Sequence, residues 1–285
     1  MPPISYSSRR TFLLACALAP VGVKSKFSGS FGLQIYSLRG AAEKDLPAAL
    51  AMIRSFGITE VEVPGMYGRK AKEFRRLLDQ ADLKATSMMA DHARLVSKIN
   101  SVVEDALVLG VEYVVCSTIP HSKKHLVLAE CDQAAKDFNR WGKILAQSKL
   151  RLGYHTHGIE FDTASEGTLF DGIVQHTDPA FVNFEMDIFW MVFAHQDPAK
   201  WLRRYPGRFP LMHVKDIRKD TPLGGSPGDV LEEASVILGE GLVDIPATLQ
   251  AAQASGVLHY YIEDEAVDAA DQIPKSLRYL KNICQ

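Results

Sequence analysis

The chain has 285 residues, with 32 Lys and Arg against 34 Asp and Glu for a formal net charge of −2, and it is 47% hydrophobic and 23% charged. This composition is typical of a globular protein with a large core, and it excludes a disordered chain, a collagen-like repeat and a small disulfide-stabilised fold. The nearly balanced charge also argues against nucleic acid as a partner, because binding to phosphate backbones requires a basic excess.

The first segment of the chain resembles an export signal. Arg9 and Arg10 precede an apolar run at 12–19, and small residues follow near 20–22. This order is similar to that of a twin-arginine signal, and the apolar run is too short to span a membrane. We therefore predict a signal at 1–28, a mature chain without a membrane span, and a periplasmic location. A frayed amphipathic N-terminus is the alternative.

The cysteines do not form a recognisable framework. With Cys16 in the predicted signal, the mature chain keeps Cys116, Cys131 and Cys284. An odd number of cysteines at wide spacings fits neither a set of disulfides nor a zinc knuckle. We predict that they act as small buried hydrophobic residues.

From residue 31 onward, short apolar runs alternate with amphipathic stretches. Strands are predicted at 31–36, 60–63, 84–89, 112–116, 151–155, 182–187, 210–214 and 260–263. Helices are predicted at 45–56, 71–81, 95–109, 129–148, 169–175, 198–204, 245–254 and 271–283. Such alternation calls for parallel strands covered by helices.

The predicted fold class is α/β, with a single (β/α)8 TIM barrel at 29–285, because each repeating unit has about 32 residues. An open, doubly wound sheet is the structural alternative. The first helix is not preceded by a Gly-x-Gly-x-x-Gly motif, which weakens that alternative and a dinucleotide site with it. A long loop is expected at 221–229, after the seventh strand.

Acidic and imidazole side chains follow the last four predicted strands. In such a barrel the carboxyl ends of the strands form the active-site face, so Glu160, Asp187, His213 and Glu263 are expected to converge there. Three converging carboxylates repel one another unless a cation compensates them. The set therefore predicts one divalent metal ion, with Mn²⁺ or Mg²⁺ preferred and Co²⁺ or Zn²⁺ as alternatives, because the ligands are mostly hard oxygens and include no thiolate.

Six short stretches carry a family resemblance. They read GLQIYSLR at 32–39, YHTHGIEF at 154–161, MDIFW at 186–190, HVKD at 213–216, GEGLVD at 239–244 and IED at 262–264. In order and spacing the chain resembles the sugar phosphate isomerase/epimerase group of xylose isomerase-like TIM barrels, over nearly all of 31–280. The resemblance implies that Glu160, Asp187, His213 and Glu263 bind the metal. It also implies that Glu160 and Glu263 exchange a proton with the substrate on opposite faces.

Other residues are expected to contact the substrate. Epimerases of the family carry a histidine three residues after the strand-six aspartate, where this chain has Trp190, which either stacks on a sugar ring or closes the barrel mouth. His155 is expected to be a satisfied core histidine, and Glu62 and Glu185 to be inward-facing acceptors. For Lys215 the alternative is a rim salt bridge. The candidate substrate contacts are Gln34, Tyr36, His92, His157, Trp190 and Lys215.

The predicted function follows from this set. A metal bound by the ketone and hydroxyl oxygens of a sugar stabilises the enediolate formed when a glutamate removes the α-proton. An export signal, and the lack of a phosphate-binding loop or arginine clamp, favour an unphosphorylated sugar or keto-sugar. We predict an isomerase or epimerase. The alternatives are a dehydratase or lyase acting on a keto-sugar or keto-glycoside, and a non-catalytic sugar-binding barrel. The sequence leaves open whether the chain forms a homo-oligomer.

Overall fold

The structure is a computed structural model that describes Phe27, 29–121, 125–226, Gly228, Val230 and 232–284. Except for Phe27, the signal predicted at 1–28 lies outside the described residues. None of the helices within those ranges combines the length and hydropathy that a membrane crossing requires.

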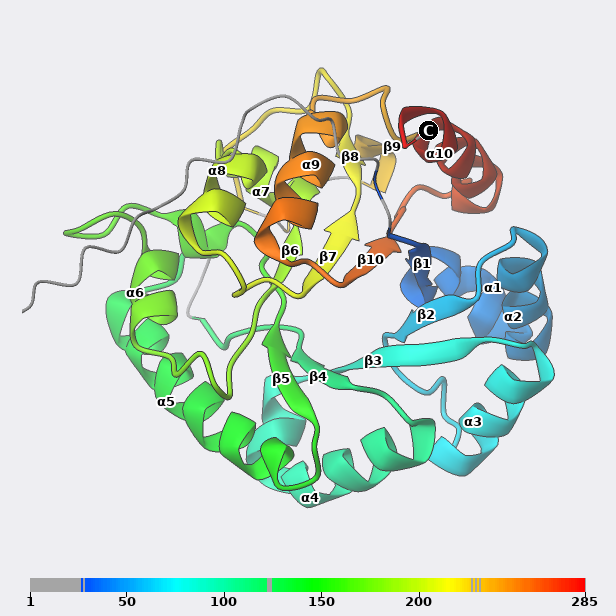
Figure 1. Cartoon of the computed structure of the whole chain (residues 1–285), viewed down its shortest axis with the longest axis horizontal. Coiled ribbons are helices and arrows are strands. Elements are labelled where there is room, and N and C mark those ends of the chain that lie inside the picture. Colours follow the sequence, from blue (N-terminus) through cyan, green and yellow to red (C-terminus); the bar gives the residue numbers. More distant parts are fainter. Residues whose placement is uncertain are drawn as a thin grey trace, which may run out of the picture.

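Eight parallel strands form a nearly closed barrel, in the hydrogen-bonded order β5-β4-β3-β2-β1-β10-β7-β6 (Figure 1). The first strand pairs with the last, since Phe31 lies opposite Tyr260. Isolated parallel bridges, one between Leu152 and Val182 and one between His155 and Glu185, link the two ends of this order. The TIM barrel prediction is therefore confirmed. The strands are β1 (Phe31–Gln34), β2 (Glu60–Val63), β3 (Lys84–Ala90), β4 (Tyr113–Cys116), β5 (Arg151–Tyr154), β6 (Glu185–Asp187), β7 (Leu211–Val214) and β10 (His259–Ile262).

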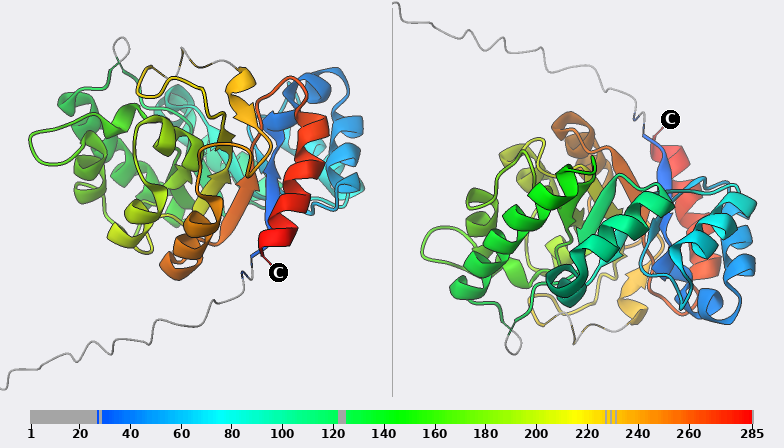
Figure 2. Two further views of the ribbon diagram at one scale, coloured as in Figure 1. Left: turned by 90° about the horizontal axis from the view of Figure 1, so that it is seen from above. Right: turned by 90° about the horizontal axis from the view of Figure 1, so that it is seen from below.

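Helices surround the strands, and the C-terminal helix α10 lies alongside β1, so the two ends of the fold are neighbours (Figure 2). The helices are α1 (Arg39–Lys44), α2 (Leu46–Ser55), α3 (Ala71–Gln80), α4 (His92–Leu109), α5 (Leu128–Ala146), α6 (Leu169–Gln175), α7 (Ile188–Phe193), α8 (Pro198–Arg204), α9 (Ile245–Ser255) and α10 (Ala269–Ile283). Short 3-10 helices lie at η1 (Ile35–Leu38), η2 (Ile159–Phe161) and η4 (Glu232–Ala234).

Several helices begin at an aspartate followed within two residues by proline. The side chains of Asp45, Asp197 and Asp244 each accept a hydrogen bond from a backbone N–H three residues on, and a proline lies in the first turn each time. The aspartate satisfies a donor that the helix leaves free, and proline has no N–H to lose there. These signals explain why the starts of α2, α8 and α9 lie within one residue of their predicted positions.

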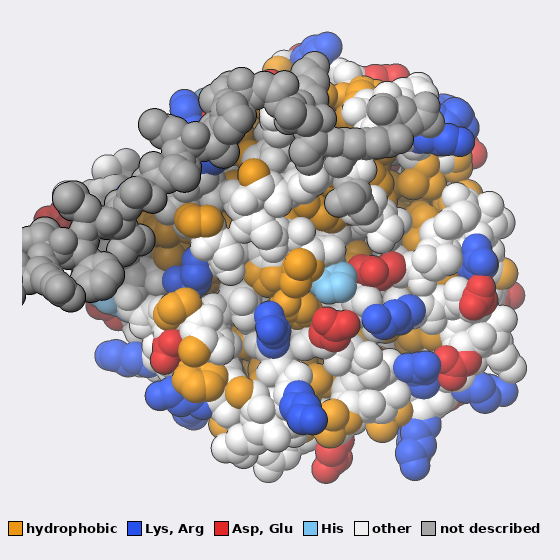
Figure 3. Space-filling view, viewed as in Figure 1, with side chains coloured by type: hydrophobic (Ala, Val, Ile, Leu, Met, Phe, Trp, Pro, Cys, Tyr) orange, Lys and Arg blue, Asp and Glu red, His pale blue; other side chains and the backbone are white. Residues whose placement is uncertain are grey.

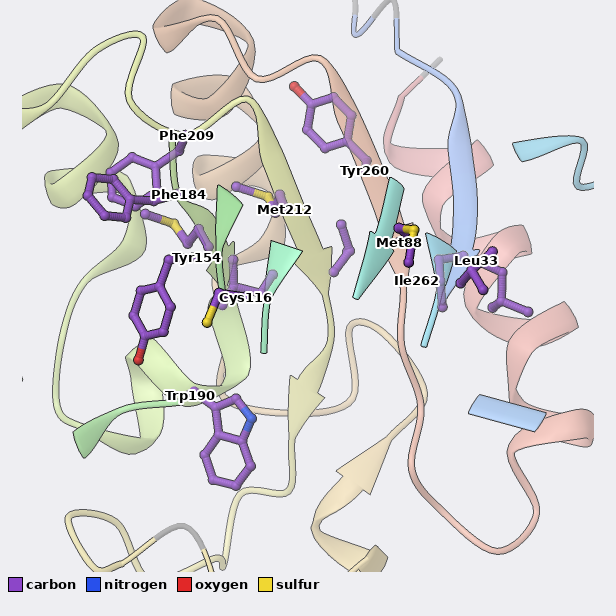
Figure 4. Close-up of a cluster of buried hydrophobic side chains, with 14 of the residues drawn as sticks. Leu33, Met88, Cys116, Tyr154, Phe184, Trp190, Phe209, Met212, Tyr260 and Ile262 are labelled. Carbon is purple, nitrogen blue, oxygen red and sulfur yellow. The ribbon is translucent and has the colours of Figure 1, made fainter. Parts of the chain in front are cut away.

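Alternation along the strands separates the helix-facing core from the barrel interior. In β7 and β10, Met212 and Ile262 belong to the main hydrophobic core, part of which is drawn in Figure 4. The intervening residues Leu211 and Tyr261 form a separate buried group with Tyr113 and Val115. Side chains alternate between the two faces of a strand. The side chain two positions after Leu211, or after Tyr261, is therefore also directed into the barrel. Polar side chains at these positions therefore meet at its mouth.

Two predicted strands are shorter than expected. The strand predicted at 31–36 ends at Gln34, whose side chain accepts a hydrogen bond from Tyr36 N at 3.1 Å and turns the chain into η1. The strand predicted at 182–187 begins at Glu185, with only a bridge at Val182. It runs directly into α7, which was not predicted from the sequence and whose first turn is capped by Asp187.

The segment after β7 contains more structure than a single loop. β8 (Asp216–Ile217) pairs antiparallel with β9 (Ser235–Val236), so the loop predicted at 221–229 lies between these two strands. Asp216 anchors the turn that follows β9 by accepting hydrogen bonds from four backbone N–H groups, those of Ile217, Gly239, Gly241 and Val243. A Cβ atom at Gly241 would lie 2.2 Å from Asp216 Oδ1, so the turn requires glycine there.

Acidic and basic side chains are interspersed over the face of the molecule seen in Figure 3. This face therefore shows no extended basic patch, in agreement with the balanced charge of the sequence.

Candidate functional site

Two histidines lie side by side at the mouth of the barrel. His213 is in β7 and His155 directly follows β5, and their ring centroids are 4.5 Å apart. Both side chains are buried. Four carboxylates contact these rings, and together the six side chains form what we call the central cluster: Glu62, His155, Glu185, Asp187, His213 and Glu263.

Two of the carboxylates, which we call the inner carboxylates, are those of Glu62 and Glu185. Glu62 Oε2 lies 2.8 Å from His213 Nε2, and Glu185 Oε2 lies 2.9 Å from His155 Nδ1. Glu62 is held in turn by Gln34, whose Nε2 donates to Glu62 Oε2 at 2.6 Å, and by the Ser87 hydroxyl. Each histidine thus has one ring nitrogen facing an inner carboxylate.

The other two, the outer carboxylates, are those of Asp187 and Glu263, and they face the remaining ring nitrogens. Glu263 Oε2 lies 3.1 Å from His213 Nδ1, and Asp187 Oδ2 lies 3.9 Å from both His213 Nδ1 and His155 Nε2. Asp187 Oδ1 caps α7, but Asp187 Oδ2 is buried and has no hydrogen-bond partner among the described residues. A buried carboxylate oxygen without a partner is costly, which indicates that something binds at this point.

Lys215 lies beside the outer carboxylates. Its side chain is buried, and Nζ lies 3.6 Å from Glu263 Oε2 and also contacts Glu265. The ammonium group is 4.7 Å from the ring centroid of Phe189 and 5.5 Å from that of Trp190. Burial opposes the positive charge, but Glu263 and Glu265 outweigh this effect and raise the pKa of Lys215. The lysine is therefore a fixed cation and not a neutral amine.

The outer carboxylates differ in charge state. Burial raises the pKa of Asp187 to about 7. Burial acts in the same direction on Glu263, but Lys215 and His213 more than reverse it and lower the pKa of Glu263 to about 2. At neutral pH, Glu263 is therefore ionised, while Asp187 is held partly protonated because burial and the charge of Glu263 outweigh the effect of Lys215 and His213 on it.

The pKa values of the inner carboxylate Glu185 and of the two histidines are shifted as well. Burial, reinforced by Glu62, raises the pKa of Glu185 well above its ordinary value. Burial would lower the pKa of His213, but Glu185 and Glu263 raise it well above the ordinary range. Burial and the neighbouring His213 lower the pKa of His155. So many strongly shifted pKa values in one buried cluster are typical of a functional site.

The central cluster fits a divalent cation. Atoms that bind one ion at roughly 2.0–2.2 Å cannot lie more than about 4.4 Å apart. Asp187 Oδ2 and Glu263 Oε2 lie 3.1–3.9 Å from the ring nitrogens that face them, which satisfies this limit. The donors are carboxylate oxygens and imidazole nitrogens, which suit Mn²⁺, Mg²⁺, Co²⁺ or Zn²⁺.

Glu160 lies apart from this cluster. Its carboxylate accepts hydrogen bonds from the Tyr154 hydroxyl and from His157 N, and within the described chain no hydrogen bond or ion pair joins it to Asp187, His213 or Glu263. Burial raises the pKa of Glu160. It lines a cavity of about 290 Å³ together with Thr118, Ile119, His121, Tyr154, His157, Ile159, Ser226 and Gly228. Of the four metal ligands expected from the sequence, the structure thus brings together Asp187, His213 and Glu263.

Three of the expected substrate contacts lie close to the central cluster. His157 packs 4.6 Å from the ring of His155 and 6.2 Å from that of Trp190. Burial lowers the pKa of His157 to about 4, so the imidazole is neutral and can accept or donate a hydrogen bond. Trp190 is 8% exposed and, with Lys215, lies beside Glu263 and Asp187.

The other expected contacts are placed differently. Gln34 is buried and binds Glu62, so it supports the central cluster from beneath. Tyr36 is 41% exposed and lies under the guanidinium of Arg39. His92 packs edge-on against Trp141 and lies 3.8 Å from Asp137, both of helix α5. The described contacts of Tyr36 and His92 therefore do not reach the central cluster.

Three residues of the site were not predicted as functional from the sequence. Tyr154 and Glu265 were not singled out, although they bind Glu160 and Lys215. His155 was expected to be a core histidine, yet it contacts two carboxylates. Strand alternation could have predicted the role of His155. His155 lies two residues after Gly153 in the direction of the mouth, and the other strands supply their polar residues at this same position.

The chain matches the family model described as xylose isomerase-like TIM barrel over residues 50–283. Among curated proteins it is similar to an inosose dehydratase of Clostridium tetani, with 27% identity over 200 residues that span 63% of this chain and 66% of that protein. The matched region is thus slightly less than two thirds of the relative's length.

Two solved structures have a similar architecture. A sugar phosphate isomerase/epimerase from Parabacteroides distasonis superimposes with a TM-score of 0.73 and 24% identity, covering 91% of this chain and 96% of that one. The IOLI protein with a binding zinc atom gives a TM-score of 0.72 and 15% identity, covering 89% and 97%. At identities this low, the two structures show the fold alone.

Proposed function

The chain belongs to the xylose isomerase-like TIM barrel family, and on this premise we propose that it is a divalent-metal-dependent isomerase or epimerase of an unphosphorylated sugar or keto-sugar. The observation that carries the proposal is the convergence of Asp187, His213 and Glu263 at the barrel mouth around a carboxylate oxygen that lacks a partner.

Asp187, His213 and Glu263 would hold the ion. We propose Mn²⁺ or Mg²⁺, because carboxylate oxygens are hard ligands, and the zinc atom bound to the IOLI protein supports Zn²⁺ as an alternative. When bound, a divalent cation polarises a substrate carbonyl and makes the hydrogen on the neighbouring carbon more acidic.

The protein groups around this point would move the proton. Glu263 is ionised and buried, so it can accept a proton from a substrate carbon without first losing one. Lys215 fixes a positive charge beside it and stabilises negative charge that develops on a substrate oxygen. We propose Glu160 as the second acid–base group, since burial favours its protonated form and it lines a cavity shared with His157.

An unphosphorylated substrate is supported by the charges at the mouth. Lys215 is already compensated by Glu263 and Glu265, so it offers little net positive charge to a phosphate group. The neutral His157 and the indole of Trp190 instead suit hydroxyl groups and the apolar face of a sugar ring.

A dehydratase is the second candidate, and the similarity to inosose dehydratase favours it. Both reactions begin with removal of the hydrogen next to a carbonyl. In the dehydratase, the hydroxyl group on the following carbon then leaves with a proton as water, and a carbon–carbon double bond forms. In an isomerase or epimerase, a proton returns to the substrate instead.

Proton exchange in deuterated water tests this proposal. Chelator-treated protein should not introduce deuterium at the α-carbon of keto-sugars, whereas protein restored with Mn²⁺ should introduce it. NMR of the sugar measures this exchange. Glu263→Gln should slow labelling by about 10²–10⁴-fold because it removes the base, whereas Glu166→Gln, at an exposed position, should not. Product lacking a hydroxyl group would select the dehydratase. Sugar binding without exchange under any metal would contradict both and indicate a non-catalytic barrel.

A further inference from the structure

Strand β5 leads to two residues able to bind a metal at the mouth, His155 and Glu160. We propose that His155 is the ligand that β5 contributes, and that Glu185 is the residue that positions it. This inference rests on the proposed function only in requiring that a divalent cation binds to the central cluster.

The His155 ring is directed at the oxygen of Asp187 that lacks a partner. Its Nε2 atom lies 3.9 Å from Asp187 Oδ2, the oxygen without a partner, and the ligand atoms of His155, Asp187 and His213 all lie within 4.8 Å of one another. The side chain is 3% exposed, so the ring is fixed by its surroundings. His155 therefore offers a buried nitrogen to the same point as His213 and Asp187.

The two histidines have similar surroundings. His213 has Glu62 at 2.8 Å and Glu185 at 3.3 Å on one ring nitrogen, and the outer carboxylates on the other. His155 repeats this pattern, with Glu185 at 2.9 Å from Nδ1 and Asp187 facing Nε2. A carboxylate on one nitrogen and a metal on the other is the usual arrangement of a ligating histidine, because the carboxylate fixes the ring orientation and its tautomer. The arrangement proposed for His213 thus applies equally to His155.

Glu160, the other candidate ligand from this segment, is bound by groups outside the central cluster. Its partner Tyr154 points to the opposite side of β5 from His155, into the helix-facing core, where its ring lies 4.9 Å from that of Phe138 in α5. In Figure 4 the Tyr154 hydroxyl points away from the packed pair Phe184 and Phe209. The Tyr154 hydroxyl and His157 N bind the Glu160 carboxylate there. These two hydrogen bonds engage the Glu160 carboxylate beside the cavity that it lines with His157, and among the described residues no hydrogen bond or ion pair joins it to His155.

Pulsed EPR on the unaltered protein tests this assignment directly. Chelator-treated protein loaded with one equivalent of Cu²⁺ should show modulation from two coordinated imidazoles, those of His155 and His213. A single coordinated imidazole would overturn the proposal. Because no substitution is involved, this measurement does not depend on whether a variant folds.

Matched variants give a second test, with Co²⁺ affinity as the readout. His155→Gln should weaken binding by at least about 100-fold, and Glu185→Gln by about 10-fold or more, in the range expected when a ligand's supporting carboxylate is removed. Glu160→Gln should change the Co²⁺ affinity by no more than about 3-fold relative to the unaltered protein. Removing even a group that supports a ligand would weaken binding by more than this. Circular dichroism on each variant separates loss of binding from loss of fold.

The outcomes distinguish this inference from the proposed function. Wild-type affinity in His155→Gln, or a large loss in Glu160→Gln, would overturn the ligand assignment and leave the proposed function standing. If Co²⁺ binding depended on His155 but the protein exchanged no α-hydrogen of keto-sugars for deuterium, the ligand assignment would be supported and the proposed function contradicted. If the unaltered protein bound neither Cu²⁺ nor Co²⁺, both would fail.

Discussion

The three cysteines of the predicted mature chain are all free, and they differ in exposure. Cys116 and Cys131 are buried, and burial raises the pKa of each thiol to about 12. Cys284 is only partly buried, at the end of α10. Since the thiolate is the reactive form, the three thiols should differ sharply in reactivity.

We expect a chromogenic disulfide reagent to label only one thiol rapidly in folded protein of residues 29–285. The fast reaction should disappear in Cys284→Ser, and the other two thiols should react only after denaturation in guanidinium chloride. Rapid labelling of two or three thiols at mildly alkaline pH would contradict the burial of Cys116 and Cys131.

Residues of the site could be predicted where strand alternation decided the direction of a side chain. Asp187, His213 and Glu263 each follow or lie in a strand at an inward position, and they meet as expected. Glu160 lies five residues beyond His155, past the irregular turn at Gly158 with φ of +96°, and alternation no longer determines direction there. The resemblance of a motif could suggest a role for Glu160, but not which side of β5 it would occupy.

At the scale of elements, Asp216 shows how one side chain organises a turn. Its two carboxylate oxygens accept four backbone hydrogen bonds and join β8 to the turn at 239–243. Burial raises the pKa of Asp216, although these hydrogen bonds oppose the effect. The turn corresponds to the GEGLVD stretch of the sequence, so that stretch has a structural role.

Asp216→Asn should therefore destabilise the fold by about 2–3 kcal/mol, because an amide nitrogen would face backbone donors. The free energy of unfolding from urea titration measures this effect. Asp220→Asn changes the same charge at an exposed position and should remain within about 0.5 kcal/mol of the parent protein. Equal urea midpoints for the two variants would show that the four hydrogen bonds contribute little.

The elements themselves were largely predictable, since each β/α unit carries its own periodicity and helix-start signals. Helix α7 was missed because it has only six residues, nearly all apolar, and follows a strand without a break. A short apolar run of this kind fits a buried strand or a buried helix equally well. In the structure, Phe189 N and Trp190 N donate hydrogen bonds to Asp187 Oδ1, and this cap favours the helix.

At the scale of the whole molecule, a bound metal should stabilise the fold. The central cluster draws residues from strands β2, β6 and β7 and from the segments after β5 and β10, so an ion there links distant parts of the barrel. At a free metal concentration about 1,000 times Kd, binding adds about 4 kcal/mol. For a chain of this size, we expect the thermal midpoint to rise by on the order of 10 °C.

Differential scanning calorimetry with and without Mn²⁺ or Zn²⁺ measures this shift. Asp187→Asn should remove most of it, whereas the exposed Glu166→Gln should preserve it. A midpoint that is the same in excess metal and in chelator would contradict the metal site.

The periplasmic location remains a proposal, supported by the Arg9–Arg10 pair ahead of the apolar run. Replacing both arginines by lysine should retain the chain in the cytoplasm, because twin-arginine export depends on the pair. Cell fractionation of the unaltered chain, the double variant and an Arg69→Lys control would show this. Equal export of all three would exclude a twin-arginine signal.

The pairing of β1 with β10 has a consequence for biosynthesis. Phe31 is among the earliest residues of the barrel to leave the ribosome, yet its partner Tyr260 is among the last. At about 5–20 residues per second, translation leaves one edge of β1 open for on the order of 10–50 s. During that interval the edge of β1 that later pairs with β10 is a free strand edge, which is a site of aggregation, and a chain truncated before residue 260 cannot close the ring of strands.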